Sequence, residues 1–203
     1  MKRANLILLI DSSGSIKGNK PGVLVDAAQN IVQMFQSICA SDNSFDGYIG
    51  ALSFGGDVSF FPLKRASDFT LIEAEFNGET RMGSMYKTLS DELSSSELFS
   101  STGDYKNIIV LLSDGGATDV SSDGFIEILR NPAFIHSKRI AVSIGDRVNK
   151  QELSAFCTLS TDLFKAEDIE PVNDVLRNTV NKLVSPKPSL QYVRRSANDS
   201  EWD

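Results

Sequence analysis

Asp11, Ser13 and Ser15 form the pattern Asp-x-Ser-x-Ser, which begins where an uninterrupted aliphatic run, residues 6–10, ends. A run of this length and composition is typical of a strand that is buried on both faces of a sheet. The acid and the hydroxyls are therefore expected together at the carboxyl end of a strand, where α/β proteins bind ligands. All three side chains offer hard oxygen atoms, and Gly14 allows a tight turn between them. This chemistry favours a divalent cation, Mg²⁺ or Mn²⁺.

A second carboxylate and a third hydroxyl fit the same site. Asp114 follows another aliphatic run, residues 108–112. In a doubly wound sheet this strand would lie beside the first, so Asp11 and Asp114 should face one crevice. Thr80 stands between them in sequence, in the glycine-bracketed loop 77–83, and we expect these glycines to let the loop backbone move. The sequence thus predicts a site of two acids and three hydroxyls.

Apolar periodicity predicts strands that alternate with helices along the chain. The predicted strands are residues 6–10, 47–54, 58–63, 107–113, 139–144 and 163–166. The predicted helices are residues 23–38, 84–99, 123–129, 151–157 and 170–184. The short glycine-rich link 55–57 indicates an antiparallel hairpin. We therefore predict an α/β fold with a doubly wound, mostly parallel sheet, one antiparallel edge strand and helices on both faces.

Length and composition limit the possible partners. At 203 residues the chain is most simply one folded domain, predicted over residues 1–184, and the composition changes to that of a tail over residues 185–203. The net charge of −7 argues against nucleic acid, because phosphate binding requires a basic face. We expect no secretory signal, because the apolar stretch near the N-terminus is too short, and no membrane association, because no other segment approaches membrane-spanning length. Cys39, Cys157 and the single His136 make neither a disulfide framework nor a zinc set. These features predict a cytoplasmic protein.

The complete set of oxygen side chains resembles the metal-ion-dependent adhesion site (MIDAS) of von Willebrand factor A domains. Asp11, Ser13, Ser15, Thr80 and Asp114 match its five positions. The resemblance implies that the three hydroxyls bind a divalent cation directly and the two acids bind it partly through water. It also implies that a protein partner donates an Asp or Glu to the cation, whose charge neutral hydroxyls neutralise poorly.

Within this superfamily the chain resembles the bacterial tellurium-resistance proteins of the TerY type, which are stand-alone cytoplasmic A domains. The similarity lies in residues 63–69, 80–83 and 163–184, although Glu79 and Arg81 replace the small residues that are usual around the loop threonine. This resemblance implies a role in tellurite or stress resistance, with kinase and phosphatase partners encoded nearby.

Enzymatic alternatives lack their confirming residues. Haloacid-dehalogenase phosphatases place a nucleophilic Asp after their first strand, as Asp11 would be, but they need a second Asp where this chain has Ser13. They also need a lysine further along the chain, and no lysine of this sequence is clearly placed for that role. A hydrolase triad is disfavoured because His136 precedes a strand, which places it at the other end of the sheet. We therefore predict a metal-dependent protein-interaction module and no enzyme.

One further acidic motif has the beginning of a calcium loop. Asp119, Asp123 and Gly124 are spaced accordingly, but the twelfth position is Arg130 instead of a bidentate Glu. We expect Ser122 or Asp123 to cap a helix there.

Overall fold

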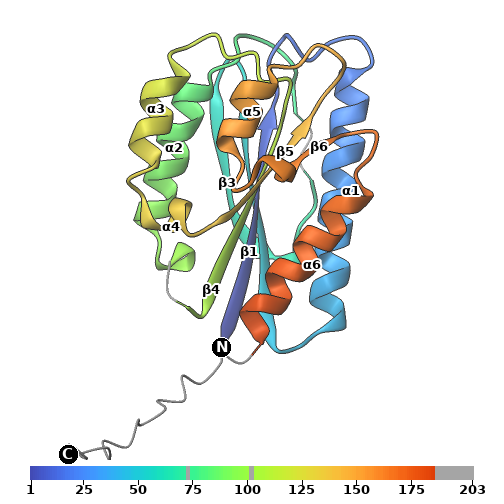
Figure 1. Cartoon of the computed structure of the whole chain (residues 1–203), viewed down its shortest axis with the longest axis vertical. Coiled ribbons are helices and arrows are strands. Elements are labelled where there is room, and N and C mark those ends of the chain that lie inside the picture. Colours follow the sequence, from blue (N-terminus) through green and yellow to red (C-terminus); the bar gives the residue numbers. More distant parts are fainter. Residues whose placement is uncertain (72–73, 101–102, 186–203) are drawn as a thin grey trace, which may run out of the picture.

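The structure is a computed structural model that describes residues 1–71, 74–100 and 103–185. Within them lies a six-stranded sheet of order β3-β2-β1-β4-β5-β6 (Figure 1). Its strands are β1 (Lys2–Asp11), β2 (Phe45–Phe54), β3 (Val58–Arg65), β4 (Tyr105–Ser113), β5 (Lys138–Ser143) and β6 (Leu163–Lys165). All neighbours pair in parallel except β2 and β3, which are antiparallel. The predicted fold class is confirmed. The predicted tail lies outside the described residues from position 186 onward.

Helices cover both faces of the sheet, as predicted. They are α1 (Lys20–Ser41), α2 (Met82–Ser95), α3 (Ser121–Ile128), α4 (Pro132–Ile135), α5 (Lys150–Phe156) and α6 (Glu170–Val184). Figure 1 shows α1 and α6 on one side of the sheet and α2, α3 and α4 on the other. Two apolar cores result, one under α1 and α6 and one under α2, α4 and α5. No helix in the described part of the chain combines the length and hydrophobicity needed to cross a membrane.

The central strand β1 contributes to both cores. Leu6, Leu8 and Ile10 pack on the side of α1 and α6, whereas Ile7 and Leu9 pack on the side of α2. Successive side chains of a strand point to opposite faces, so a continuous aliphatic run is needed where helices cover both. Each buried aliphatic side chain contributes about 1.5 to 3 kcal/mol to folding. This burial anchors the strand whose carboxyl end carries Asp11.

The pairing of β1 with β4 brings the two predicted acidic strand ends together. Ile10 lies opposite Leu112 in the parallel register, so Asp11 ends its strand beside the Ser113–Asp114 pair. The expectation that these two strands are neighbours is therefore confirmed.

Several local boundaries differ from the prediction. The helix expected over residues 84–99 ends at Ser95, because Ser96 adopts an extended conformation and its side chain accepts the Leu98 amide to begin a separate 3-10 turn. The short helix α4 was not predicted. Asn131 starts it by accepting the Ala133 amide at 2.9 Å, and so short a segment has too few residues to show a helical period.

The expected cap of α3 is wrong. This helix begins at Ser121 after Val120 without any side-chain cap, so Ser122 and Asp123 lie in its first turn. Asp119 instead accepts the backbone amides of Gly83 and Ser84 at 2.9 and 3.0 Å, at the start of α2. The carboxylate therefore caps a different helix, where the exposed amides favour negative charge.

The edge strand β3 contains an irregularity opposite β2. Lys64 pairs with Ile49 and Phe61 pairs with Ala51, so the single residue Gly50 faces two residues of β3, one of which is Pro62. Proline cannot donate to a ladder, which explains its place at a bulge in an outer strand.

Two glycines let α2 and α3 approach closely. A Cβ atom on Gly124 would lie 2.5 Å from the Gly83 carbonyl oxygen and 3.0 Å from its Cα. These contacts are with backbone and cannot be relieved by rotating a side chain. Since α2 follows the Thr80 loop and α3 follows the Asp114 loop, this contact helps to fix the two loops relative to each other.

We predict opposite effects for two Gly→Ala substitutions inside helices. Gly124→Ala should destabilise the protein by about 1 to 3 kcal/mol through overpacking. Gly22→Ala in α1, where an added Cβ meets nothing within 4 Å, should stabilise it by about 0.4 to 1 kcal/mol by restricting the unfolded chain. Denaturant unfolding of both variants measures the difference, and a stabilised Gly124→Ala variant would contradict the packing argument.

Candidate metal centre

Asp11 is fully buried at the end of β1, and both of its carboxylate oxygens have hydrogen-bond donors. The Ser13 amide donates to Oδ1 at 3.0 Å and the Ser113 hydroxyl donates to Oδ2 at 2.6 Å. Burial raises the pKa of the Asp11 carboxyl above its ordinary value, these hydrogen bonds oppose the rise, and the charge of Asp114 adds to it. The position therefore favours a nearby cation.

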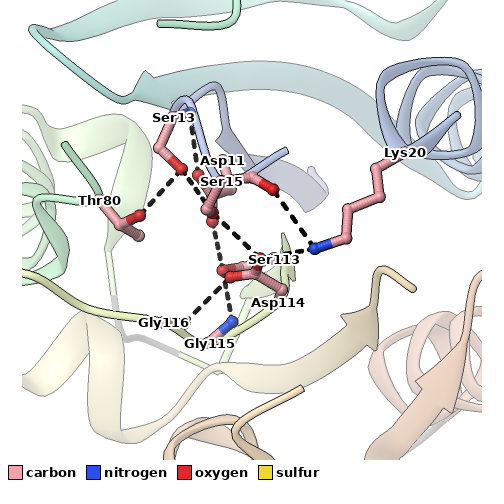
Figure 2. A network of polar contacts seen from close by, with 9 residues as sticks. All are labelled: Asp11, Ser13, Ser15, Lys20, Thr80, Ser113, Asp114, Gly115 and Gly116. Atoms are coloured by element: carbon pink, nitrogen blue, oxygen red, sulfur yellow. Dashed lines mark hydrogen bonds and ion pairs between the residues drawn. The ribbon is translucent and has the colours of Figure 1, made fainter. Parts of the chain in front are cut away.

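Three hydroxyls form a chain that ends on the second carboxylate (Figure 2). Thr80 Oγ1 donates to Ser13 Oγ at 2.9 Å, Ser13 Oγ lies 3.0 Å from Ser15 Oγ, and Ser15 Oγ donates to Asp114 Oδ2 at 3.0 Å. A hydroxyl has one proton to donate, so Ser13 is the donor to Ser15. Four of the five predicted residues thus share one contact chain. Asp11 lies beside it, linked through the Ser13 amide.

The spacing of these oxygens fits a small divalent cation. Six oxygens at 2.0 to 2.1 Å from Mg²⁺ place adjacent oxygens about 2.9 Å apart at the corners of an octahedron. The contacts from Thr80 to Ser13, from Ser13 to Ser15 and from Ser15 to Asp114 are all 2.9 to 3.0 Å long. The donor atoms are all oxygens, which Mg²⁺ and Mn²⁺ prefer over softer ligands. The chemistry of the donor set fits the predicted cation, and the spacing, which is also that of ordinary O–H···O hydrogen bonds, is compatible with it.

Soft metal ligands form no comparable cluster. Within the described residues, no group of three or more His, Cys, Asp or Glu side chains is placed to hold a metal ion. Burial raises the pKa of Cys39 to about 12 and that of Cys157 to about 11. These thiols stay protonated near neutral pH, and a protonated thiol is a poor ligand.

The loop that carries Asp114 is shaped by its own hydrogen bonds. The Gly115 amide donates to Ser113 Oγ at 2.9 Å and the Gly116 amide donates to Asp114 Oδ1 at 3.1 Å. Gly115 has a φ of 74°, and a Cβ there would lie 2.8 Å from the Asn149 carbonyl oxygen. Glycine is therefore required at this turn.

The Thr80 loop is attached to both neighbouring loops. The Gly14 amide donates to the Gly78 carbonyl at 3.0 Å, and the Thr118 amide donates to the Thr80 carbonyl at 2.9 Å. A Cβ on Gly78 would lie 2.3 Å from the Gly56 Cα. One on Gly83 would lie 2.7 Å from the carbonyl oxygen of Val120, which directly precedes α3. We expected these glycines to make the loop movable. The structure shows that they also permit close backbone packing, and the expected movement stays a prediction.

The residues that flank Thr80 differ in exposure. Met82 is fully buried in the core under α2 and cannot contact a partner. Glu79 and Arg81 are exposed and form an ion pair with Nε and Oε2 3.5 Å apart. The unusual residues around the threonine therefore lie on the surface beside the site.

Sequence reasoning missed three side chains that build the site. Ser113 donates to Asp11, Lys20 pairs with Asp114 at 2.9 Å, and Asp119 caps the helix that follows Thr80. Ser113 directly precedes a predicted ligand, and this position was the available signal. The contacts of Lys20 and Asp119 join segments that are distant in sequence and have no local pattern.

The geometry does not favour the haloacid-dehalogenase alternative. A nucleophilic carboxylate needs an accessible oxygen, whereas Asp11 is 0% exposed and its two oxygens already accept hydrogen bonds. The lysine at the site contacts Asp114 instead.

His136 lies at the amino-terminal end of the sheet, whereas Ser13 lies at its carboxyl-terminal end, as predicted. It follows α4 and its carbonyl accepts the Lys106 ammonium at 2.6 Å, near the amino ends of β4 and β5. It lines a cavity of about 570 Å³ there, together with Lys182 of α6. A Ser–His pair with Ser13 is therefore excluded.

Comparison with known families agrees with the fold. The chain matches the von Willebrand factor type A domain over residues 5–178, and it belongs to this family. Domains of this family are metal-dependent adhesion and interaction folds and are in general interaction modules. No curated protein matches the sequence.

Solved structures with similar folds come from varied organisms. Proximal thread matrix protein 1 of the mussel byssus, with a zinc-occupied MIDAS motif, is 18% identical with a TM-score of 0.63, over 88% of this chain and 48% of that one. The pilus adhesin SpaC from Lactobacillus rhamnosus GG is 13% identical with a TM-score of 0.65, over 91% and 31%. The ArnB paralog VWA2 from Sulfolobus acidocaldarius is 19% identical with a TM-score of 0.59, over 87% and 45%. This chain spans less than half of each, and such identities show the fold alone.

The buried charge of Asp11 predicts a specific pH dependence of stability. A carboxyl whose folded-state pKa is raised above its ordinary value favours folding while it is protonated. That contribution is lost as the pH rises through the folded-state pKa. In chelator, we therefore expect Asp11→Asn to gain stability relative to the wild type as the pH rises above about 4, the ordinary pKa of an Asp.

Asp42→Asn is the matched control. Hydrogen bonds from Ser44 lower the pKa of this exposed carboxyl, so the substitution should give a change of the opposite sign. Denaturant unfolding at several pH values measures both variants. A stability difference for Asp11→Asn that falls as the pH rises would contradict the assignment.

Proposed function

We propose that this domain is a metal-dependent protein-interaction module. A divalent cation, Mg²⁺ or Mn²⁺, is held by the MIDAS residues Asp11, Ser13, Ser15, Thr80 and Asp114. The observation that carries this proposal is the chain of oxygens 2.9 to 3.0 Å apart at the carboxyl edge of the sheet. The cation supplies a Lewis-acidic centre that can accept one further carboxylate.

The side chains around this centre have separate tasks. Ser13, Ser15 and Thr80 offer neutral oxygens, so they orient the cation without cancelling its charge. Asp11 and Asp114 supply the negative charge, and Asp11 is shielded from solvent by the strand ends around it. The centre therefore recruits an Asp or Glu of a protein partner, and no catalytic residue is assigned.

The biological setting follows from the resemblance to TerY-type proteins. We infer a cytoplasmic protein of tellurite or stress resistance whose partner is a kinase or phosphatase encoded nearby. The exposed pair Glu79 and Arg81 borders the centre and would form part of the surface that meets this partner. A pull-down from the source cell, with and without chelator, followed by identification of the captured protein, tests this setting.

The first prediction of this proposed function concerns the binding of the metal alone. The wild type should bind one Mg²⁺ or Mn²⁺, and Ser13→Ala should weaken binding at least about tenfold, because perturbing even an outer-shell partner commonly costs that much. Ser12→Ala is the matched control, since Ser12 lies in the same loop outside the hydroxyl chain. Calorimetry with Mg²⁺, Mn²⁺ and Zn²⁺ measures affinity and preference, and we expect the hard oxygen set to show no preference for Zn²⁺. A wild type that binds no divalent cation would refute the proposal.

The second prediction concerns the partner. Thr80→Ala should keep much of the affinity for Mg²⁺ but lose about 2 to 5 kcal/mol of partner binding, as when one side of a buried charged contact is truncated. Thr80→Ser, which keeps the hydroxyl, should retain both. Partner affinity is compared for the three proteins in Mg²⁺ and in chelator. Equal binding under all conditions would show that the partner uses another surface.

A further inference from the structure

Lys20 places an ammonium group directly on the candidate metal centre. This first residue of α1 puts its Nζ atom 2.9 Å from Asp114 Oδ2 and 3.3 Å from the backbone oxygen of Ser15 (Figure 2). Its side chain is only 21% exposed. Ser15 Oγ donates to the same Asp114 oxygen at 3.0 Å. The ammonium and a hydroxyl of the predicted metal site therefore share one carboxylate oxygen of Asp114.

The fold leaves space for the Lys20 stem. Gly145, just after β5, has a φ of 82°, and a Cβ there would lie 2.8 Å from Lys20 Cε and 3.5 Å from its Cδ and Cγ. The absence of a side chain at this position lets the methylene stem run past the end of β5 toward Asp114. The extended stem thus lies against protein instead of standing free in water.

The formal charges of the site show what this lysine does. Among the described residues, Lys20 is the only cationic side chain that forms an ion pair with Asp11 or Asp114. Two carboxylates and one ammonium leave a formal charge of −1. A divalent cation changes this to +1, whereas without the lysine the same two states would carry −2 and zero.

We propose that Lys20 is a tethered cation that competes with the divalent metal for Asp114 and leaves the loaded centre with a surplus positive charge that selects a carboxylate ligand. The inference rests on the proposed metal-dependent function. It assigns two opposite effects to one side chain. Lys20 weakens the binding of metal through like-charge repulsion, and it strengthens the binding of an anion to the metal-loaded site.

Three variants separate these effects. Lys20→Met removes the charge and keeps an unbranched stem, and Lys20→Arg keeps the charge. Lys17→Met is the matched control, because Lys17 is an exposed residue of the same loop without an ion pair in the described structure. All three are compared with the wild-type chain at one fixed salt concentration.

Three measurements are made: thermal unfolding in chelator, calorimetric titration with Mg²⁺, and displacement of water from bound Mn²⁺ by acetate. Proton relaxation monitors the displacement of water. We expect Lys20→Met to unfold at a lower temperature in chelator, to bind Mg²⁺ on the order of tenfold more tightly, and to bind acetate more weakly when loaded. Lys20→Arg and Lys17→Met should stay near the wild type in all three.

Three results would overturn the inference in distinguishable ways. If the wild type binds metal and Lys20→Met binds Mg²⁺ and acetate no differently from Lys17→Met, the lysine has no such role and the metal centre itself stands. If no protein binds a divalent cation, the proposed function and this inference both fail. An Lys20→Met variant that binds metal and acetate both more tightly would also refute the surplus-charge argument.

Discussion

Asp11 ends the most buried strand of the sheet, and its carboxylate receives only neutral donors. Removing a charge from water costs several kcal/mol unless other groups compensate for it. Here the Ser13 amide and the Ser113 hydroxyl supply part of that compensation, and the neighbouring Asp114 increases the cost. The pairing of β1 with β4 places two acids side by side at the carboxyl ends of these strands. The hydroxyls, the turns and the nearby ammonium stabilise these acids.

Three loops hold these groups, and each is attached to the others. The first loop bonds to the Thr80 loop through Gly14 and Gly78, and the Thr80 loop bonds to the Asp114 loop through Thr118. Asp119 extends this connection to the first turn of α2. Because the links between the loops are mostly backbone hydrogen bonds, the fold itself positions the backbones from which the side-chain oxygens extend.

The fold, and the grouping of the five candidate residues at one end of the sheet, could be predicted from the sequence because both depend on local patterns. Aliphatic runs identify strands, and acids at the ends of such runs mark one edge of a parallel sheet. Lys20 could not be found in this way, because a lysine in the first turn of a helix usually points to solvent and its contact requires Gly145 from another part of the sheet. The role of Asp119 was missed for the same reason, since it caps a helix that precedes it in the chain. Gly78 and Gly83 have a second use that the sequence did not reveal, because glycine also permits close backbone packing.

The irregular edge strand β3 has a consequence for association. An outer strand normally offers a row of free amides and carbonyls that can pair with a strand of another molecule. In β3, Pro62 lacks an amide, the bulge opposite Gly50 interrupts the ladder, and Lys64 and Arg65 add two charges at the end of the strand. This edge is a poor template for extending the sheet, which opposes the edge-to-edge aggregation to which a central sheet with a long outer strand is otherwise prone.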